Sequence, residues 1–160
     1  MTISIRLAQT SDAADIARLS TQHGYKTESS LVALRLTRLL SRPDQQFFVA
    51  EDNHHVVGWL HASILEYVEM DAFVVIGGLV VDKNQRRKGI GSLLLNHAEE
   101  WAKKEGFSIV RLCSSASRTA AHEFYQGLGY TKIKTQYAFV KSLSEDGGEN
   151  LKMFIPNVDE

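Results

Sequence analysis

Cysteine and proline are scarce in this sequence of 160 residues, which contains one cysteine and two prolines. The single cysteine, Cys113, excludes an internal disulfide, and the lack of a Cys-x-x-Cys pair argues against a thiolate metal site. The six histidines are scattered, or adjacent as in His54-His55, without the spacing that would place two ligands on one helix face. We therefore expect a protein that holds no metal.

Net charge and long apolar runs are lacking too. The 18 basic and 19 acidic residues give a formal charge of −1, so no global field favours nucleic acid or an anionic membrane. The longest apolar stretch, Phe73 to Val81, is far too short to cross a bilayer. The opening residues, Met1 to Arg6, do not have the basic-then-apolar pattern of a signal peptide. These absences predict a cytoplasmic protein that binds neither nucleic acid nor membrane.

What remains is the composition of a globular protein, with 44% hydrophobic and 23% charged residues. A chain of this length is sufficient for one domain with a core and short for two. No repeat, low-complexity tract or linker interrupts it. We predict a single domain over residues 1–160. The sequence does not decide between a monomer and a homodimer.

The hydrophobic pattern predicts seven strands and four helices. Period-two alternation or short apolar runs between turn residues predict strands at 3–7, 46–51, 55–66, 72–81, 107–112, 130–140 and 151–155. Helical spacing predicts helices after Asp12, at 29–40, from Ile90 to about Trp101, and from Ala121 to Leu128. The apolar residues of the second helix are Leu31, Leu34, Leu39 and Leu40. The expected fold class is layered α/β (α+β), with a mixed, mostly antiparallel sheet of about seven strands flanked by about four helices.

The segment from Gln85 to Ser92 has the properties of a phosphate-binding turn between a buried strand and a long helix. Its two glycines, Gly89 and Gly91, allow main-chain N–H groups to converge without Cβ obstruction. The start of a helix offers unpaired N–H groups and a positive dipole end. The run Arg86 to Lys88 adds positive charge at the same place. The alternative is a charged loop whose glycines only serve a tight turn.

Two other phosphate-binding motifs do not fit this segment. The Walker motif requires Gly-Lys-Ser/Thr, and here Ser92 follows Gly91 directly. The dinucleotide fingerprint requires a third glycine in an N-terminal β–α unit, and this turn lies in the middle of the chain. A pyrophosphate site of another kind is the remaining interpretation.

A pair of glycines, Gly77-Gly78, interrupts the apolar strand that precedes the turn. Glycine within a buried strand marks either a β-bulge or a close approach by a neighbouring group. A bulge would free a main-chain N–H, whereas a packing glycine would only accommodate a neighbour. A ligand whose diphosphate lay at Gly89 to Gly91 could extend along Leu79 to Val81, which favours the bulge.

Together these segments resemble the GNAT superfamily of N-acetyltransferases. The resemblance runs from Gly77 to Asp82 and through Arg86-x-x-Gly89-x-Gly91 at a helix start. It continues with Phe124-Tyr125 and with Gly129-Tyr130. The predicted order of strands and helices agrees with this family over nearly the whole chain.

The resemblance implies acetyl-CoA as co-substrate, with its pantetheine arm on the strand and its pyrophosphate on the turn. The cofactor-binding residues it implies are Leu79, Val80, Val81, Arg86, Arg87, Lys88, Gly89, Ile90, Gly91, Ser92 and Arg118. The catalytic residues it implies are Leu79, whose N–H would polarise the thioester carbonyl, and Tyr125, the acid for the leaving thiol. Arg118 stands where many members have asparagine. Tyr125 also has a structural interpretation, because it lies beside an apolar helical stripe.

The general base is not identified by the sequence. A primary amine of pKa about 10.4 is mostly protonated at neutral pH, so a proton acceptor should help. Many relatives place a glutamate on the strand near the bulge, and this strand has none. The nearby candidates are Glu28, His61, Glu66, Glu69 and Asp71.

Two classes of function therefore stay open. The first is an enzyme that acetylates a small-molecule amine, with a protein amine as a variant. The second is a sensor that binds acetyl-CoA without turnover. The acidic residues Glu66, Glu69 and Asp71 suggest a cationic acceptor such as a polyamine or aminoglycoside.

Overall fold

The computed structural model describes residues 2–155, and the chain divides after Leu112 into two compact units. The first unit contains β1 (Ile3–Leu7), α1 (Ala13–Gln22), α2 (Ser29–Leu40), β2 (Gln45–Asp52), β3 (His55–Tyr67), β4 (Met70–Val81), α3 (Ile90–Lys104) and β5 (Val110–Leu112). Two short 3-10 helices, η1 (Thr10–Asp12) and η2 (Lys83–Gln85), lie between these elements. The second unit contains α4 (Thr119–Gly127) and η3 (Glu149–Phe154). Within the described range, no helix has both the length and the apolar character needed to span a membrane.

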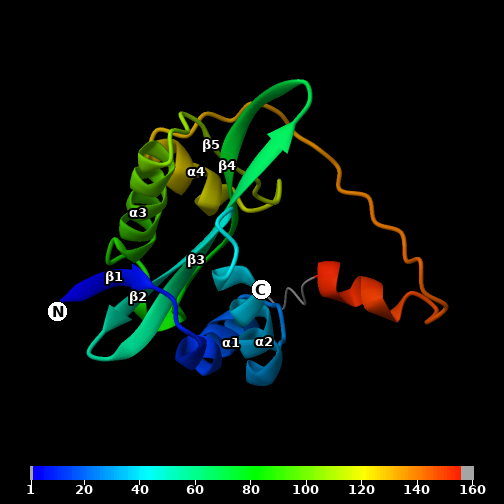
Figure 1. Cartoon of the computed structure of the whole chain (residues 1–160), viewed down its shortest axis with the longest axis horizontal. Helices are drawn as coiled ribbons and strands as arrows, with labels where there is room; N and C mark the ends of the chain where they lie inside the picture. Colours follow the sequence, from blue (N-terminus) through cyan, green and yellow to red (C-terminus); the bar gives the residue numbers. More distant parts are fainter. Residues whose placement is uncertain (1, 156–160) are drawn as a thin grey trace. The chain divides into compact units, whose positions relative to one another are not determined.

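The sheet of the first unit has the strand order β1-β2-β3-β4-β5 (Figure 1). The first four strands are antiparallel neighbours, and β5 pairs with β4 in parallel. The parallel pair is joined through α3, as a parallel connection requires a crossover. This confirms the α/β class and the mixed, mostly antiparallel sheet.

Helices cover both faces of this sheet, because neighbouring residues of a strand point to opposite sides. In β2, Phe47 and Val49 are buried in one cluster with apolar residues of α1 and α2. Phe48, between them, meets the ring of His97 on α3 edge-on at 6.0 Å. Figure 1 shows α3 apart from the α1–α2 pair. The sheet therefore has an α1–α2 face and an α3 face.

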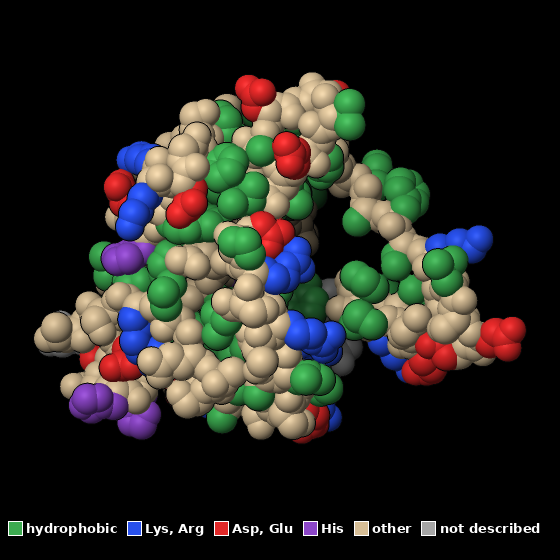
Figure 2. All heavy atoms as spheres, viewed as in Figure 1, with side chains coloured by type: hydrophobic (Ala, Val, Ile, Leu, Met, Phe, Trp, Pro, Cys, Tyr) green, Lys and Arg blue, Asp and Glu red, His purple; other side chains and the backbone are tan. Residues whose placement is uncertain are grey.

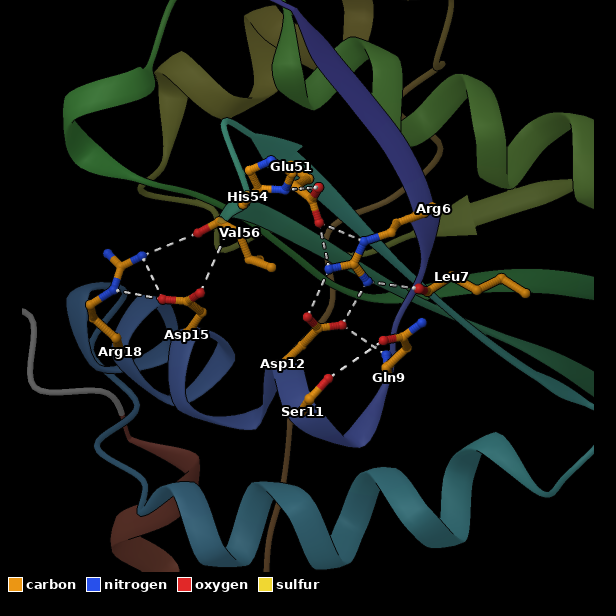
Figure 3. Close-up of polar contacts among 10 residues, drawn as sticks. All are labelled: Arg6, Leu7, Gln9, Ser11, Asp12, Asp15, Arg18, Glu51, His54 and Val56. Atoms are coloured by element: carbon orange, nitrogen blue, oxygen red, sulfur yellow. Dashed lines mark hydrogen bonds and ion pairs between the residues drawn. The ribbon is translucent and has the colours of Figure 1, made fainter.

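An arginine on β1 ties three elements together (Figure 3). Arg6 donates through Nη1 and Nη2 to the two carboxylate oxygens of Asp12, at 2.9 and 2.8 Å, and through Nε to Glu51 at 2.7 Å. Asp12 also accepts the N–H of Gln9 at 2.8 Å. Burial raises the pKa of Asp12, but the hydrogen bonds from Arg6 and Gln9 outweigh it and hold the pKa below its usual value.

We expect Asp12→Asn to lower the free energy of unfolding by about 1.5 kcal/mol at neutral pH, because the buried carboxylate loses its charge-assisted bonds. The cost stays moderate because Arg6 keeps Glu51 as a partner. A carboxyl group with a lowered folded pKa stabilises above its unfolded pKa and loses that contribution as pH falls below about 4. Urea titrations of both proteins from pH 7 to pH 3 measure this, and the difference between them should shrink towards pH 3. A difference independent of pH would contradict the assignment to Asp12 ionisation.

The expected strands at 130–140 and 151–155 are wrong. Residues 131–140 form no strand, and 149–154 form the 3-10 helix η3. Gly148 starts η3 in a left-handed conformation, and Asp146 accepts the N–H groups of Gly148 and Asn150. A strand has no hydrogen bonds of its own, so apolar alternation forms one only where a neighbour pairs with it. In the described part of the chain, the sheet therefore has five strands rather than about seven. Ile133, Tyr137 and Phe139 are exposed, and Figure 2 shows hydrophobic side chains, coloured green, on the surface of the molecule.

One helix and one strand of the first unit also differ in detail from expectation. Leu31 and Leu34 of α2 are exposed, and Val32 and Leu36 are the residues that it buries. The strand β5 is shorter than predicted because Phe107 completes the end of α3, donating its N–H to Ala102 at 2.8 Å. Elsewhere the predicted strands and the four helices are confirmed within one to three residues at each end.

Candidate active site

β4 carries a bulge at the glycine pair. The register of β3 and β4 joins His61 to Gly78 and the next residue, Ala62, to Ile76, so Gly77 is one extra residue on β4. Gly77 is exposed, whereas Ile76 is buried. The predicted bulge is therefore confirmed, and it lies on the strand that precedes the glycine-rich turn.

Beyond the bulge, alternate residues of β4 direct their main-chain groups away from β3. The N–H of Asp82 donates to the carbonyl of Val57 at 2.8 Å. In an antiparallel ladder, pairs that exchange hydrogen bonds alternate with pairs that do not. The main-chain N–H and C=O of Val80, two residues before Asp82, are therefore directed towards β3. The N–H and C=O groups of Leu79 and Val81 are directed to the opposite side.

That opposite side of β4 is paired only as far as the bulge. β5 pairs with Val74, Val75 and Ile76 and ends at Leu112. In the described part of the chain, no strand continues this pairing along residues 77–81. The two strands therefore separate beyond the bulge, and the main chain of Leu79 and Val81 lies at an open sheet edge.

The turn that follows β4 is fixed by residues of α1. The carboxylate of Asp82 accepts the N–H of Asn84 at 3.0 Å and Nη1 of Arg18 at 2.9 Å. Burial raises the pKa of Asp82, but the bonds from Asn84 and Arg18 prevail and the pKa lies below its usual value. Gln22 accepts the N–H of Lys83 at 3.1 Å. Arg18 also donates to the carbonyl of Val56 at 3.1 Å (Figure 3).

α3 begins with main-chain N–H groups that the helix itself does not use. Gly89 is the N-cap, with φ of 78°, and the first intrahelical bond runs from Leu93 N–H to Gly89 O at 3.0 Å. The N–H groups of residues 89–92 precede that bond and are directed out of the helix start. A side chain at Gly89 would meet no atom within 4 Å, so the approach to these donors is open.

Three cationic residues stand beside this helix start. Arg86, Arg87 and Lys88 are exposed, and Lys88 Nζ donates to Gln85 Oε1 at 2.8 Å. Arg87 has φ of 63°, a left-handed conformation that costs a residue with a side chain about 1 kcal/mol. We call residues 86–92 the anion cradle, since they combine converging N–H groups, a helix dipole and local positive charge.

The second glycine of the pair accommodates a tryptophan. A Cβ at Gly78 would lie 2.5 Å from Cζ3 and 2.6 Å from Cη2 of Trp59. Trp59 is held in turn by Phe47, with ring centroids 5.3 Å apart. Both interpretations of the glycine pair are therefore correct: Gly77 forms the bulge, and Gly78 is a packing glycine.

His61 of β3 lies opposite the bulge on the α1–α2 face. Its Nε2 is 2.7 Å from Oε1 of Gln45, which also accepts the hydroxyl of Ser63 at 2.8 Å. Its ring stacks on Phe47 at 5.4 Å and 25°. Burial, and then the charge of Arg42, lower the pKa of His61 below its usual value.

Arg118 and Tyr125 belong to the second unit. Arg118 is the N-cap residue of α4, and its carbonyl accepts the N–H of His122 at 3.2 Å. Tyr125 is half-buried between the rings of Phe124 and Tyr130, at 5.2 and 6.0 Å. Burial raises the pKa of Tyr125, an effect that the charge of Arg118 opposes. The phenol is therefore protonated at neutral pH, as a proton donor must be.

The acidic residues near the β3–β4 turn form an exposed hairpin end. Glu66, Glu69 and Asp71 are exposed. Glu28, the N-cap residue of α2, is exposed as well. Cys113 is exposed as well. Of the candidate bases on the β3–β4 hairpin, His61 is the one that lies at the bulge.

Sequence reasoning did not find the residues that position the site. Arg18 and Gln22 hold the turn from more than sixty positions away. Gln45 of β2 hydrogen-bonds His61 and also accepts the hydroxyl of Ser63. None of these residues belongs to a local motif. Only the strand register and the packing of α1 reveal them.

Comparison with models of known protein families identifies the family of this chain. A model described as the acetyltransferase (GNAT) family matches residues 11–130, which include β4, the anion cradle and α4. The chain belongs to this family, and it is an N-acetyltransferase.

Curated relatives are N-acetyltransferases of several kinds. An uncharacterized N-acetyltransferase of Bacillus subtilis is 29% identical over 133 residues, covering 80% of this chain and 89% of its own. One from Methanocaldococcus jannaschii is 36% identical over 94 residues, covering 58% of this chain and 42% of its own, so the match spans under half of that relative. An aminoglycoside N(6')-acetyltransferase type 1 of Acinetobacter haemolyticus is 30% identical over 101 residues, covering 59% and 68%.

Solved structures share the fold. An aminoglycoside antibiotic 6'-N-acetyltransferase from Acinetobacter haemolyticus matches with a TM-score of 0.75 and 22% identity, covering 88% of this chain and 99% of that one. The structure of AAC(6')-Iy in complex with the bisubstrate analogue CoA-S-monomethyl-acetylneamine has a TM-score of 0.79 and 18% identity, covering 89% of this chain and 99% of that one. A transcriptional regulator from Bacillus halodurans also has a TM-score of 0.79, at 21% identity, covering 88% and 100%.

Proposed function

We propose that this N-acetyltransferase transfers the acetyl group of acetyl-CoA to a primary amine of a small molecule by direct attack on the thioester. The observation that carries the proposal is the continuity of residues 77–92, where a bulged, half-paired strand leads directly into the anion cradle. Acetyl-CoA, when bound, supplies an acetyl group activated as a thioester. The chain offers the groups that such a ligand needs, since main-chain donors line an open edge and an open helix start.

Each residue of this stretch has a distinct role in the proposal. The main chain from Leu79 through Val80 to Val81 hydrogen-bonds the amide-containing arm of the ligand as a neighbouring strand would. The N–H of Leu79 donates to the thioester carbonyl oxygen and stabilises the negative charge that develops there. The anion cradle, Arg86 to Ser92, binds the pyrophosphate, and Arg118 contributes further positive charge.

Tyr125 is proposed as the acid that protonates the leaving thiol. We expect Tyr125→Phe to lower kcat about tenfold, below the hundredfold or more that is typical of acid catalysis, because a thiol of pKa about 8.5 leaves as a thiolate without much help. The KM for acetyl-CoA should stay the same, since phenylalanine keeps the ring. Steady-state thiol release at pH 7 measures both constants, with Tyr137→Phe, an exposed tyrosine of the same unit, as the control. Equal effects of the two substitutions would remove Tyr125 from the mechanism.

The function itself is tested by thiol release from acetyl-CoA across a panel of polyamines, aminoglycosides and lysine peptides. Amine-dependent release supports the enzyme and shows the acceptor class. Saturable CoA binding without release from any acceptor would favour a sensor, and release with peptides alone would favour a protein acetyltransferase. Repeating the panel with Glu66→Lys and Glu69→Lys tests whether the acidic hairpin end attracts cationic acceptors. Failure to bind CoA would overturn the proposal.

The family match covers residues 11–112 of the first unit and residues 113–130 of the second, which supports one N-acetyltransferase domain over residues 1–160. A small-molecule acceptor, a cytoplasmic location and the absence of a bound metal, of nucleic acid and of membrane remain part of the proposal. So do the two oligomeric alternatives, monomer and homodimer.

A further inference from the structure

The side chain of His61 faces the bulge with one specific atom. A methyl group at Gly77, the extra residue of the bulge, would lie 3.8 Å from Nδ1 of His61. The bulge is also the point where the pairing of β4 with β5 stops. The imidazole nitrogen therefore lies at the start of the open edge that the proposed function assigns to the thioester.

The contacts of His61 select its tautomer. Oε1 of Gln45 accepts a hydrogen bond from the Ser63 hydroxyl at 2.8 Å and lies 2.7 Å from Nε2 of His61. A carbonyl oxygen only accepts, so Nε2 carries the hydrogen and Nδ1 keeps its lone pair. The stack on Phe47 fixes the plane of the ring. Nδ1 is thus a proton acceptor held at a defined place.

The surroundings also keep the ring uncharged at neutral pH. Burial disfavours the imidazolium, and the nearby cation Arg42 acts in the same direction, so the pKa of His61 lies below its usual value. Arg42 is itself paired with Asp44, at 2.8 Å from Nη2 to Oδ2. Gln45 and Phe47, which contact the ring, are neutral, and so is Ser63, which donates to Gln45.

We infer that His61 is the general base of the acetyl transfer, accepting on Nδ1 the proton of the acceptor amine at the β4 bulge. This inference rests on the proposed function. The nitrogen–hydrogen bond of the ammonium breaks and its electron pair becomes available for attack. A carbon–nitrogen bond to the acetyl carbon then forms while the carbon–sulfur bond breaks, and the thiolate leaves. The nitrogen then loses its second proton to solvent, Tyr125 protonates the thiolate and is itself reprotonated by solvent, and His61 returns its proton to solvent.

The strand glutamate that many relatives carry is replaced here by a histidine on the adjacent strand. Glu66, Glu69 and Asp71 lie towards the exposed end of the hairpin, at least five residues along the chain from His61, and a strand rises about 3.3 Å per residue. A carboxylate there would stand roughly 15 Å from the bulge, beyond direct proton transfer.

The test compares His61→Gln with wild type in thiol release from acetyl-CoA, with spermidine and kanamycin as acceptors, from pH 6 to pH 10. Glutamine can still hydrogen-bond Gln45 but is not basic. We expect kcat/KM to fall about a hundredfold at pH 7, the typical contribution of a general base. The deficit should shrink as pH rises towards the amine pKa of about 10, where the acceptor is neutral without help. A structural role would give a deficit independent of pH.

His97→Gln is the matched control, because His97 is an exposed histidine on the α3 face of the same sheet. It should keep wild-type rates at every pH. Calorimetric affinity for CoA should be unchanged in both variants, which separates loss of the base from loss of the cofactor site.

Nitrogen-detected NMR of the ligand-free protein gives a readout apart from activity. The His61 ring should show a protonated Nε2 and a bare Nδ1 at pH 7, and Gln45→Leu should remove this preference. A proton found on Nδ1, or wild-type kcat/KM in His61→Gln, would overturn the base assignment while leaving the acetyltransferase intact. A wild-type protein that binds no CoA, or releases no thiol with any acceptor, would overturn the proposed function and the base together.

Discussion

Alanine at Gly78 should lower the free energy of unfolding by about 2 to 3 kcal/mol, whereas alanine at the adjacent Gly77 should change it by less than about 0.5 kcal/mol. The two substitutions add the same methyl group one residue apart. At Gly78 the methyl would overlap the Trp59 ring, with its nearest atom 2.5 Å away. Trp59 is stacked on Phe47, so moving the ring disturbs the α1–α2 face of the core. At Gly77 the nearest atom is 3.8 Å away, an ordinary contact.

Urea denaturation of both variants measures the difference, and a double-mutant cycle with Trp59→Phe gives its cause. The smaller ring should recover at least about 1 kcal/mol of the Gly78→Ala cost, because neighbouring residues couple by this amount. Additive costs would mean that the strain lies elsewhere in β4. Gly77→Ala offers a further comparison, since its methyl group stands beside Nδ1 of His61 and should reduce turnover in a protein of normal stability.

Removing two charges from the anion cradle should weaken CoA binding about thirtyfold, or about 2 kcal/mol, when Arg87 and Lys88 are both replaced by glutamine. Each cation contributes a charge-assisted contact beside a helix start that already favours an anion. The matched control is Lys103→Gln with Lys104→Gln, which removes the same charge from the other end of α3. That control should leave the affinity within about twofold of wild type, since surface charges a helix length away are screened by salt.

Calorimetry with CoA and with pantetheine, which lacks the pyrophosphate, isolates the contribution of the cradle. Pantetheine should bind wild type and the Arg87/Lys88 double variant equally weakly. The CoA difference should also narrow as ionic strength rises. Equal losses for both ligands would place the defect in the strand edge and contradict a pyrophosphate site at residues 86–92.

The parts of the site that lie close together in the sequence were predictable. The bulge at Gly77 and the helix start at Gly89 follow from glycines in a buried strand and at a strand-to-helix turn, which need no knowledge of tertiary contacts. The packing role of Gly78 required the position of Trp59 on the neighbouring strand. The roles of His61 and Asp82 required partners from distant segments, and those partners follow only from the register and the helix packing.

The strands of the fold were predictable where each strand has a neighbouring strand to pair with. The antiparallel strands β1 to β4 combine apolar alternation with turns, and their pairing follows. The same alternation at residues 130–140 was not sufficient, because pairing depends on a neighbour that a one-dimensional pattern does not contain. In α3, Leu93 and His97 have the helical spacing of an apolar stripe but are exposed, and Leu95 and Ala102 are buried instead. The helical period in the sequence predicts how wide the apolar face of a helix is more reliably than it predicts which residues lie at the centre of that face.

The grip of Arg18 and Gln22 on the start of the turn has a thermodynamic consequence. Gln22 and Arg18 hold the residues leading to the anion cradle in place before any ligand arrives. The conformational entropy of this turn is therefore lost when the chain folds rather than when a ligand binds, and this preorganisation favours affinity for an anion.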